Sequence, residues 1–450
     1  MTRRVAVVGG GISGLATAFA LQQRGLAPTV FEASASPGGK IRATEVDGIR
    51  VEEGPDAFLP RDDRPLALLR ALGLEDDLIS PAVFGAYIWF NGRLRRLPPG
   101  SPYGIPRSPR EAQRAGLLSP MGAARASLER FWPRPLTGPD ISIGELVRKR
   151  FGTQVAERMV DPLLAGVRGG HLDRISLAAA AREIDELARR RRSITAALRA
   201  QGPPAPPRFI TPREGMGRIV TALQDRVEEV RSNRPVDRIE VSGEGLTLDG
   251  SESFDAAVLA VPTFAAAEIV ARIDPRTASL LRSIQHASVA SIALVYPPGA
   301  TAIPADGSGF LVPTAERMAL AACTWYSNKW PNETTSDRIV LRAVAGRAGE
   351  DPALGLDDDA LVDRVRRDLA TTMGIEAAPL ATRVTRWDRS IPQYAVGHLN
   401  LIEEVEGNLA AAGPIFVTGA GYRGSGIPDC IAQAERTADA VAGRVGVSGG

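Results

Sequence analysis

The sequence predicts an α/β fold whose N-terminal βαβ unit is completed by segments from far along the chain. The run from Arg4 to Val8 is strand-like and ends in glycines, after which apolar residues from Ile12 to Phe19 recur at helical spacing. Residues 29 to 32 form a second strand-like run, and residues 415 to 418 return to a strand followed by glycines and a helical pattern. Because parallel strands of such units are buried on both faces, we expect one sheet assembled from these separated segments.

The composition is that of an ordinary globular protein. Of the 450 residues 44% are apolar and 24% charged, and 54 basic residues nearly balance 52 acidic ones. The net charge of +2 therefore predicts no nucleic-acid partner. Cys323 and Cys430 form no CxxC pair, so we expect no disulfide scaffold, no metal site and a cytoplasmic location. The most apolar later stretch, residues 256 to 267, is too short for a transmembrane segment and contains Pro262.

A glycine-rich turn follows the first strand, in the run Gly9-Gly10-Gly11-Ile12-Ser13-Gly14. In this G-x-G-x-x-G pattern the first glycine permits a tight turn, the second lets the backbone approach a pyrophosphate, and the third lets the helix pack on the strand. The N-terminus of the helix then faces the phosphates with its free N–H groups. Glu32 ends the second strand, where a carboxylate accepts hydrogen bonds from ribose hydroxyls. These residues predict a dinucleotide site.

A second glycine pair favours FAD over NAD as the dinucleotide. The segment Pro37-Gly38-Gly39-Lys40-Ile41-Arg42 resembles the one that follows the acidic residue in flavin enzymes of the amine-oxidase type. Two glycines open space beside the ribose and pyrophosphate, and Lys40 or Arg42 neutralises phosphate charge. The alternative is a surface turn with solvated basic side chains. We predict FAD as the cofactor.

A third glycine-rich turn precedes the C-terminal helix. Residues 419 to 429 end at this helix, with Pro428 near the first-turn position that tolerates its missing N–H. A helix N-terminus aimed at the pyrimidine edge of a flavin stabilises the negative charge of the reduced ring. The alternative is a glycine-rich loop that only caps a core helix.

These residues also carry a family resemblance, which runs in order from residue 5 to about 440. The whole chain resembles the oxygen-dependent porphyrinogen oxidases of haem synthesis, which comprise protoporphyrinogen oxidase and its bacterial coproporphyrinogen-oxidising relatives. Shared flavin motifs alone indicate only the superfamily, whereas the tryptophan-rich and Pro-Gln-Tyr blocks are specific to this family. Beyond the flavin fingerprint, the matching blocks are residues 53 to 59, 161 to 167, 322 to 331, 386 to 394 with Gly397-His398, and 426 to 431.

The resemblance implies where FAD binds. It places the adenosine on Glu32, Ala33 and the Val236 backbone, and the diphosphate on the loop of Gly9, Gly11, Ile12, Ser13 and Gly14. It places the flavin ring beside a set of residues from four segments: Gly39, Lys40, Gly54, Pro55, Asp56, Ala57, Trp387, Ser425, Gly426, Ile427 and Pro428.

The resemblance and the changes of texture along the chain together predict three domains. The first is a Rossmann-like FAD-binding domain of the amine-oxidase/glutathione-reductase type, over residues 1–80, 208–262 and 385–450. The second is a mixed α+β substrate-binding domain, over residues 81–95 and 263–384. Residues 96–207 form a mostly helical insert with long helical patterns at 142–151 and 176–198, and residues 201–207 form a stiff proline-rich linker.

The substrate of the family lies between the middle sheet and the helical insert. Arg61 is a candidate contact because a guanidinium binds a carboxylate in a bidentate way, and a solvated surface role is the alternative. Arg168 is a second candidate, since residues 168 to 170 stand where relatives often carry an aromatic and a small residue.

The implied reaction removes six electrons from coproporphyrinogen III in three flavin cycles, each reducing one O2 to hydrogen peroxide. The substrate supplies acidic pyrrole N–H groups and the driving force of aromaticity, so we assign no catalytic base. We expect His171, His286 and His398 to be surface or packed residues and both cysteines to be packed. The run from Arg189 to Arg192 is expected to be a solvated helix face, with a weak membrane or partner contact as the alternative.

Other functions stay open on sequence alone. Protoporphyrinogen IX is the alternative substrate. We prefer coproporphyrinogen III because the chain resembles bacterial members of the family that lack membrane anchors. An amine oxidase or a carotenoid-type desaturase would use the same flavin scaffold, but the sequence shows no clear aromatic cage. A flavoprotein that only binds FAD or a partner is a third possibility. The expected partners are the porphyrinogen and O2, with transient contact to neighbouring enzymes of the haem pathway and peripheral contact to a membrane.

Overall fold

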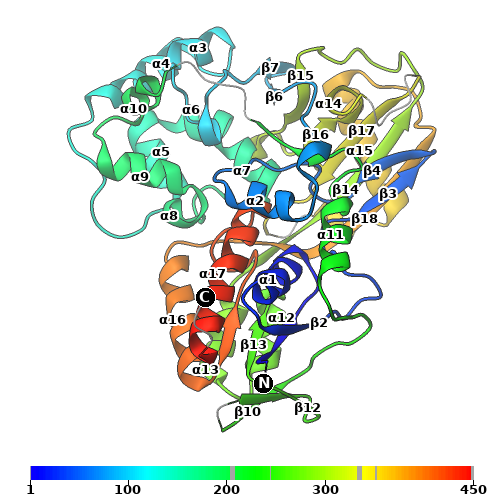
Figure 1. The fold of residues 1–450 in the computed structure, drawn as a ribbon. Coiled ribbons are helices and arrows are strands. Elements are labelled where there is room, and N and C mark those ends of the chain that lie inside the picture. The colour runs from blue at the N-terminus through cyan, green and yellow to red at the C-terminus, as the bar shows by residue number, and fades with distance from the viewer. Residues whose placement is uncertain (1, 203–207, 244, 332–336, 350–351, 447–450) are drawn as a thin grey trace.

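The fold has three regions, which Figure 1 shows as a lower part and two upper parts. The computed structural model describes residues 2–202, 208–243, 245–331, 337–349 and 352–446, apart from the side chains of residues 167 and 168. The lower part holds the parallel sheet and both ends of the described chain. A large mixed sheet forms the upper right part and a group of helices the upper left.

A five-stranded parallel sheet organises the lower part, and its strand order is β19-β13-β1-β2-β9. The strands come from three distant parts of the chain, as the glycine turns at both ends of the chain predicted. In β1 the apolar residues from Val5 to Val8 are buried, because helices cover both faces of the sheet. The strands are β1 (Arg4–Val8), β2 (Ala27–Phe31), β9 (Val230–Arg231), β13 (Ala256–Leu259) and β19 (Ile415–Val417).

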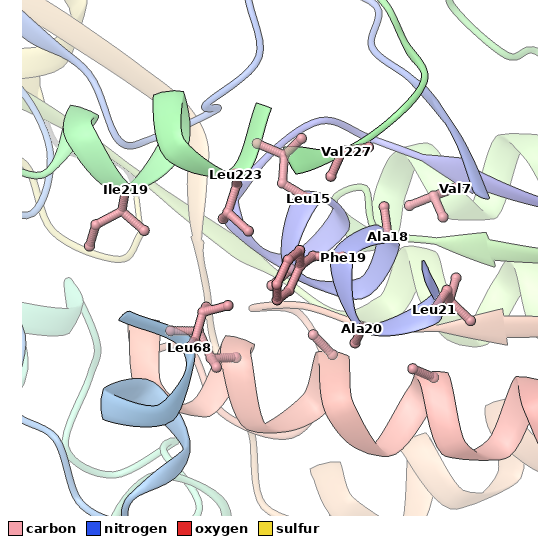
Figure 2. Close-up of a cluster of buried hydrophobic side chains, with 14 of the residues drawn as sticks. Val7, Leu15, Ala18, Phe19, Ala20, Leu21, Leu68, Ile219, Leu223 and Val227 are labelled. Atoms are coloured by element: carbon pink, nitrogen blue, oxygen red, sulfur yellow. The ribbon is translucent and has the colours of Figure 1, made fainter. Parts of the chain in front are cut away.

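One face of this sheet is covered by helices that pack around α1 (Ile12–Gln22). Figure 2 shows this cluster, in which Leu15 and Phe19 of α1 meet Leu68 of α2 and Leu223 of α11. The helix α17, which ends the described chain, packs along α1 in the same cluster. The covering helices are α2 (Arg64–Ala71), α11 (Gly217–Arg226) and α17 (Ile427–Val445). Both ends of the chain are thereby joined in one core.

The opposite face is covered by three helices and a small antiparallel sheet, all of which share one core with β1 and β13. The helices are α12 (Thr263–Val270), α13 (Pro275–Ser283) and α16 (His398–Ala412), and the strands are β10 (Ile239–Ser242), β11 (Gly245–Leu248) and β12 (Glu252–Phe254). The boundary at residue 262 stays a prediction. Residues 263–283 lie with the parallel sheet because their apolar faces are buried there, a contact that no local pattern reveals.

The upper right part is a seven-stranded sheet of order β18-β14-β17-β16-β15-β6-β7, in which only β15 and β6 pair in parallel. The boundary at residue 385 also stays a prediction, and it falls within a strand of this sheet. Strand β18 continues to Pro392 and pairs with β14 over its length, so Trp387 belongs to this sheet. The strands are β6 (Gly85–Phe90), β7 (Arg93–Arg96), β14 (His286–Tyr296), β15 (Gly307–Leu311), β16 (Leu320–Trp325), β17 (Ile339–Ala345) and β18 (Ala381–Pro392).

The two faces of the large sheet are covered differently. The helix α15 (Asp358–Met373) packs its Leu361, Val365 and Leu369 on one face. The other face meets a hairpin of β3 (Ala43–Val46) and β4 (Ile49–Glu52), together with the short helix α14 (Tyr326–Lys329). The hairpin leads directly into residues 53 to 57, so the sheet and the predicted flavin loop are neighbours. A short pair, β5 (Leu78–Ile79) with β8 (Thr211–Pro212), lies between the regions.

The upper left part is helical from residue 102 to residue 200. The pattern at 142–151 forms one helix, whose N-cap Ser142 accepts the N–H of Glu145. The long pattern at 176–198 is instead three short helices, because Ser176 and Ser193 each cap a new start. Of the predicted linker, residues 203–207 lie outside the described residues. The helices are α3 (Pro109–Arg114), α4 (Pro120–Ser127), α5 (Ile143–Phe151), α6 (Thr153–Val155), α7 (Asp161–Arg168), α8 (Leu177–Ala180), α9 (Arg182–Arg190) and α10 (Ile194–Ala200).

Candidate active site

The first glycine loop lies between β1 and α1 and has the shape of a phosphate cradle. Gly9 has a φ of +107°, and a Cβ at Gly14 would collide with the carbonyl oxygen of Gly9. At Gly11, by contrast, a Cβ would meet no atom within 4 Å. Gly11 is also the N-cap of α1, so the first N–H groups of this helix adjoin that open space. The loop therefore fits a dinucleotide pyrophosphate.

Glu32 follows β2 and holds the loop from the side. Its Oε2 accepts the N–H of Gly10 at 2.7 Å, and its Oε1 accepts the N–H of Ser34 at 2.8 Å. The segment that contains Val236 runs beside it, since the N–H of Arg234 donates to the Glu32 carbonyl at 2.8 Å. The structure thus brings together the residues that were predicted for the adenosine end.

The second glycine pair packs directly on the first loop. The N–H of Gly38 donates to the carbonyl oxygen of Gly10 at 2.8 Å, and a Cβ at Gly39 would lie 3.4 Å from the Gly11 Cα. The Nζ of Lys40 donates to the Ser390 carbonyl oxygen, and burial lowers the pKa of this ammonium. The pair therefore packs against the first loop, while Gly39, Lys40 and Arg42 remain exposed at the surface.

The loop from Glu53 to Ala57 continues from the hairpin and meets the end of β18. The indole Nε1 of Trp387 donates to the Glu53 carbonyl oxygen at 3.1 Å. The guanidinium of Arg42 pairs with the Glu53 carboxylate and lies 4.8 Å from the centre of the Trp387 ring. A Cβ at Gly54 would collide with the Lys40 carbonyl oxygen, so only glycine fits between these segments.

The side chain of Asp56 is bound by the tryptophan-rich block rather than free for a ligand. Its oxygens accept hydrogen bonds from Lys329 Nζ at 2.8 and 2.9 Å and from Trp330 Nε1 at 3.3 Å. Although burial raises the pKa of a carboxyl group, the nearby Lys329 and Arg342 hold the pKa of Asp56 well below its usual range. Asp56 is thus a charged residue that ties the flavin loop to α14.

The third glycine turn connects β19 to α17 and is held by the Pro-Gln-Tyr block. The hydroxyl of Tyr394 donates to the Ala420 carbonyl oxygen at 2.5 Å and accepts the N–H of Gly424 at 3.1 Å. His398 stacks on the Tyr394 ring at 4.2 Å, and its Nε2 lies 2.7 Å from the Tyr422 carbonyl oxygen. Burial lowers the pKa of His398 to about 4, so this imidazole is neutral.

The same turn reaches the first glycine loop. A Cβ at Gly419 would lie 3.3 Å from the Ser13 Oγ, so residues from both ends of the chain meet here. Gly426 caps α17, and its N–H donates to the Asp429 carboxylate at 3.1 Å. Ser425, Ile427 and Pro428 stand around this helix start, as predicted. The two helix N-termini, of α1 and α17, therefore open toward one region.

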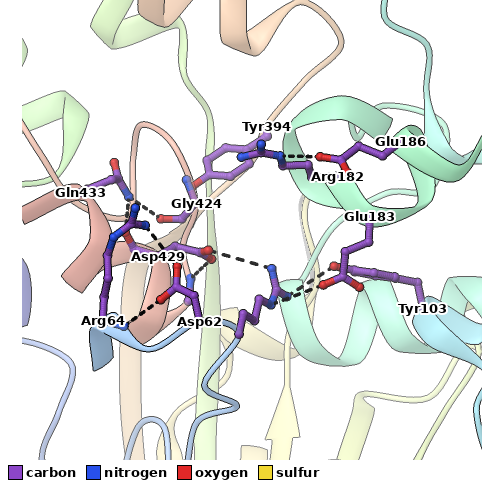
Figure 3. Close-up of polar contacts among 12 residues, drawn as sticks. Asp62, Arg64, Tyr103, Arg182, Glu183, Glu186, Tyr394, Gly424, Asp429 and Gln433 are labelled. Atoms are coloured by element: carbon purple, nitrogen blue, oxygen red, sulfur yellow. Dashed lines mark hydrogen bonds and ion pairs between the residues drawn. The ribbon is translucent and has the colours of Figure 1, made fainter. Parts of the chain in front are cut away.

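Arg61 contacts both the helical insert and α17, and Figure 3 shows three of the residues that surround it, Tyr103, Glu183 and Asp429. Its guanidinium donates to the Tyr103 hydroxyl at 3.3 Å and lies 4.0 Å from the Glu183 carboxylate. A third contact reaches Asp429 in the first turn of α17, at 3.9 Å. Arg61 is thus loosely paired and 41% exposed rather than a freely solvated side chain. Arg168 ends α7, and its side chain lies outside the described residues.

The remaining candidate residues have the packed roles that were expected. Cys323 and Cys430 are buried, and desolvation raises the pKa of the Cys430 thiol to about 11. His286 contacts Thr263 at 2.9 Å, and burial lowers its pKa to about 4. Sequence reasoning missed Tyr394, His398, Lys329 and Arg342 as residues that shape the site. Three of them, Tyr394, His398 and Lys329, stood in matched blocks, but their partners are distant in sequence.

Comparison with known proteins identifies this arrangement. Residues 12–442 match the family of flavin containing amine oxidoreductases. The chain belongs to this family. As a flavin oxidoreductase it uses FAD. Among the helices that the structure describes, none combines the length and the apolar character of a membrane span.

Curated relatives and solved structures align over nearly the full chain of this flavin oxidoreductase. Coproporphyrinogen III oxidase of Bacillus subtilis is 34% identical, with 96% of each chain covered. Coproporphyrinogen III oxidase of Mycobacterium tuberculosis H37Rv is 36% identical, with 98% of this chain and 97% of the relative covered. A crystal structure assigned to a protoporphyrinogen oxidase of Exiguobacterium sp. 255-15 has a TM-score of 0.87 and 28% identity over 98% of this chain and 99% of that one.

Proposed function

We propose that this flavin oxidoreductase oxidises coproporphyrinogen III to coproporphyrin III in haem biosynthesis. The observation that carries the proposal is the 34% and 36% identity to two coproporphyrinogen III oxidases over at least 96% of all chains. The match extends beyond the FAD cradle into the seven-stranded sheet and the helical insert. Six electrons and six protons leave the substrate and reduce three O2 to three hydrogen peroxide.

We further propose how the chain holds FAD. The adenosine lies against Glu32, Ala33 and the Val236 backbone, and the pyrophosphate lies over the loop from Gly9 to Gly14. The flavin ring lies between the loop from Gly54 to Ala57 and the turn from Ser425 to Pro428. The support is that three glycine segments contact one another, with Gly38 on Gly10 and Gly419 beside Ser13. Lys40 supplies positive charge in this region.

The residues around the flavin position would bind and orient rather than exchange protons. FAD, when bound, accepts hydride from the substrate and is reoxidised by O2. The positive end of the α17 dipole favours negative charge near Gly426. We assign no base to the chain, because His398 and Asp56 are both buried and hydrogen-bonded within the protein, to the Tyr422 carbonyl oxygen and to Lys329. The pyrrole N–H protons are then released by the substrate itself.

The proposed substrate region lies between the seven-stranded sheet and the helical insert. Helix α7 packs closely on β15 and β16, since a Cβ at Gly166 would lie 2.7 Å from Leu311 and 3.2 Å from the Ala321 carbonyl oxygen. We also propose that the chain divides into an FAD part, a sheet part and a helical part, the last over residues 96–207.

Arg61, which lies between the FAD part and the helical part, is the proposed contact for a propionate of the substrate. Arg168 is a second candidate.

The decisive experiment compares anaerobic flavin reduction by coproporphyrinogen III and by protoporphyrinogen IX. We expect the flavin absorbance to bleach faster with coproporphyrinogen, and in air we expect porphyrin fluorescence with three hydrogen peroxide per product. Putrescine serves as the amine control, because similarity at 18% identity to putrescine oxidase extends to the fold alone. Equal rates with both porphyrinogens would contradict the choice of substrate. Lack of bleaching by either would contradict the proposed function.

Protoporphyrinogen IX is the second candidate substrate. It is favoured by the similarity to the Exiguobacterium structure and by a chloroplastic protoporphyrinogen oxidase of rice at 28% identity. The cytoplasmic location, the contact with neighbouring haem-pathway enzymes and the peripheral membrane contact stay predictions.

A further inference from the structure

Three consecutive carbonyl groups at the start of the flavin loop are held by side chains of the seven-stranded sheet. The Nη1 of Arg342 donates to the carbonyl oxygens of Glu52 at 3.0 Å and Gly54 at 2.6 Å. Between them, the carbonyl of Glu53 accepts the indole N–H of Trp387 at 3.1 Å. Arg342 lies on β17 and Trp387 on β18, the two strands that flank β14. The sheet therefore sets the course of this backbone.

The guanidinium of Arg342 is itself fixed on a second side. Its Nη2 lies 3.6 Å from the Asp56 carboxylate, and the two side chains are 11% and 9% exposed. Asp56 in turn accepts hydrogen bonds from Lys329 and Trp330. Arg342 thus contacts the loop at Glu52, Gly54 and Asp56, which no single-donor side chain at that position reaches. Two cations, Lys329 and Arg342, thus surround the Asp56 carboxylate, and the buried Glu52 carboxyl group, whose pKa burial raises to about 7, also interacts with Arg342.

The loop depends on such side-chain contacts for physical reasons. Pro55 lacks an N–H group, and Gly54 is flexible yet must lie against the Lys40 carbonyl oxygen, where a Cβ would collide. Carbonyl groups buried away from water need a donor, and for Glu52 and Gly54 that donor is Arg342. Without it the loop would lose both anchors at once, while the strand β17 would keep its ladder.

We propose that Arg342 is a positioning residue for the flavin: it holds the loop from Glu52 to Asp56 in the conformation that receives the ring and adds positive charge beside it. The inference rests on the proposed placement of FAD but not on the choice of substrate. Two consequences follow. Loss of the two hydrogen bonds from the Arg342 guanidinium weakens FAD binding. Loss of its charge makes the flavin harder to reduce, because the reduced ring is anionic.

The test replaces Arg342 with Met, which removes both donors and charge, and with Lys, which keeps the charge. Arg338 is the control for the same replacement, because it lies just before β17 and its ion pairs with Asp47 and Asp337 are at 3.2 and 3.1 Å near the surface. We would measure the dissociation constant of FAD, the visible spectrum of the bound flavin and its reduction potential against redox dyes, without any porphyrinogen. Thermal unfolding of the apoprotein reports folding.

We expect Arg342→Met to weaken FAD binding by about tenfold or more, since a hydrogen bond from a charged donor is lost at two carbonyls. We expect its flavin potential to become more negative, Arg342→Lys to be intermediate, and Arg338→Met to match the parent chain. The proposal would be overturned if both Arg342 variants had the FAD dissociation constant and the flavin reduction potential of the parent chain. If the Met variant does not fold, wild-type values in the Lys variant alone overturn it. Failure of porphyrinogen to reduce the parent flavin would contradict only the proposed function.

Discussion

Tyr394 and Gly424 are joined by a hydrogen bond of 3.1 Å in which the phenol oxygen accepts the glycine N–H. The same hydroxyl donates to the Ala420 carbonyl oxygen, so one side chain at the end of the Pro-Gln-Tyr block holds both arms of the third glycine turn. The ring is kept in place by stacking on His398. A residue from outside the dinucleotide fold therefore shapes the turn that leads to α17.

Tyr394→Phe is expected to destabilise the holoprotein by about 1–3 kcal/mol, because two buried polar groups of the turn lose their partner. We also expect weaker FAD binding, since the turn loses both anchors. Denaturant unfolding and FAD titration measure the two effects. Tyr87→Phe is the matched control, because the Tyr87 hydroxyl bonds to Asp306 near the surface. An unchanged FAD affinity in Tyr394→Phe would show that the turn keeps its shape unaided.

Gly14→Ala is expected to abolish FAD binding, because the added Cβ would collide with the Gly9 carbonyl oxygen in the phosphate cradle. Gly443→Ala is the control, because a Cβ at this helical position meets nothing within 4 Å. We expect the control to bind FAD normally and to be more stable by about 0.5–1 kcal/mol. Flavin absorbance of the purified proteins and thermal unfolding decide both points. A yellow Gly14→Ala protein would contradict the proposed cradle.

Glu52 is expected to make the stability depend on pH. Burial raises the pKa of this carboxyl from 4.5 to about 7, although Oε1 accepts the Met216 N–H at 2.9 Å. Because the folded pKa exceeds the unfolded one, the contribution of Glu52 to the free energy of unfolding is fully present below about pH 4.5 and is lost as the pH rises to about 7, by roughly 3 kcal/mol in total.

Glu52→Gln removes this titration. We expect the variant to gain stability relative to the parent chain at pH 8 compared with pH 5.5, as measured by urea unfolding at both values. Comparing the two proteins cancels the titration of His286 and His398, whose lowered pKa values of about 4 act in the opposite direction. A stability difference that is the same at both pH values would refute the raised pKa.

Arg61→Ala is expected to change stability by less than about 1 kcal/mol, because its ion pairs with Glu183 and Asp429 are long and partly exposed. If Arg61 binds a propionate, the variant has a raised KM for coproporphyrinogen III with little change in kcat. Steady-state kinetics separate the two constants. Arg70→Ala is the control, since Arg70 pairs with the exposed Asp63 at 2.6 Å. A fall in kcat alone would contradict substrate binding by Arg61.

Local patterns were enough for the cradle and its cofactor. The spacing of Gly9, Gly11 and Gly14 after a buried strand dictates a turn that few other residues fit, and Glu32 follows from the next strand. Similar local glycine patterns also predicted the turn at Gly38-Gly39 and the turn before α17. Long-range packing was not predictable in this way: α12 and α13 pack on the parallel sheet and β18 extends past residue 385, because burial against a distant partner decided both.

The sequence by itself determined the glycine turns and the strands that precede them, because each depends on residues within a few positions of one another, and the family resemblance added the cofactor. Only the tertiary structure decided which side chains hold the flavin loop. Asp56, predicted as a cofactor contact, binds Lys329, and the carbonyls next to it bind Arg342 and Trp387. These contacts join segments hundreds of residues apart, and a buried charge finds its partner through the packing of whole sheets, which no local spacing encodes.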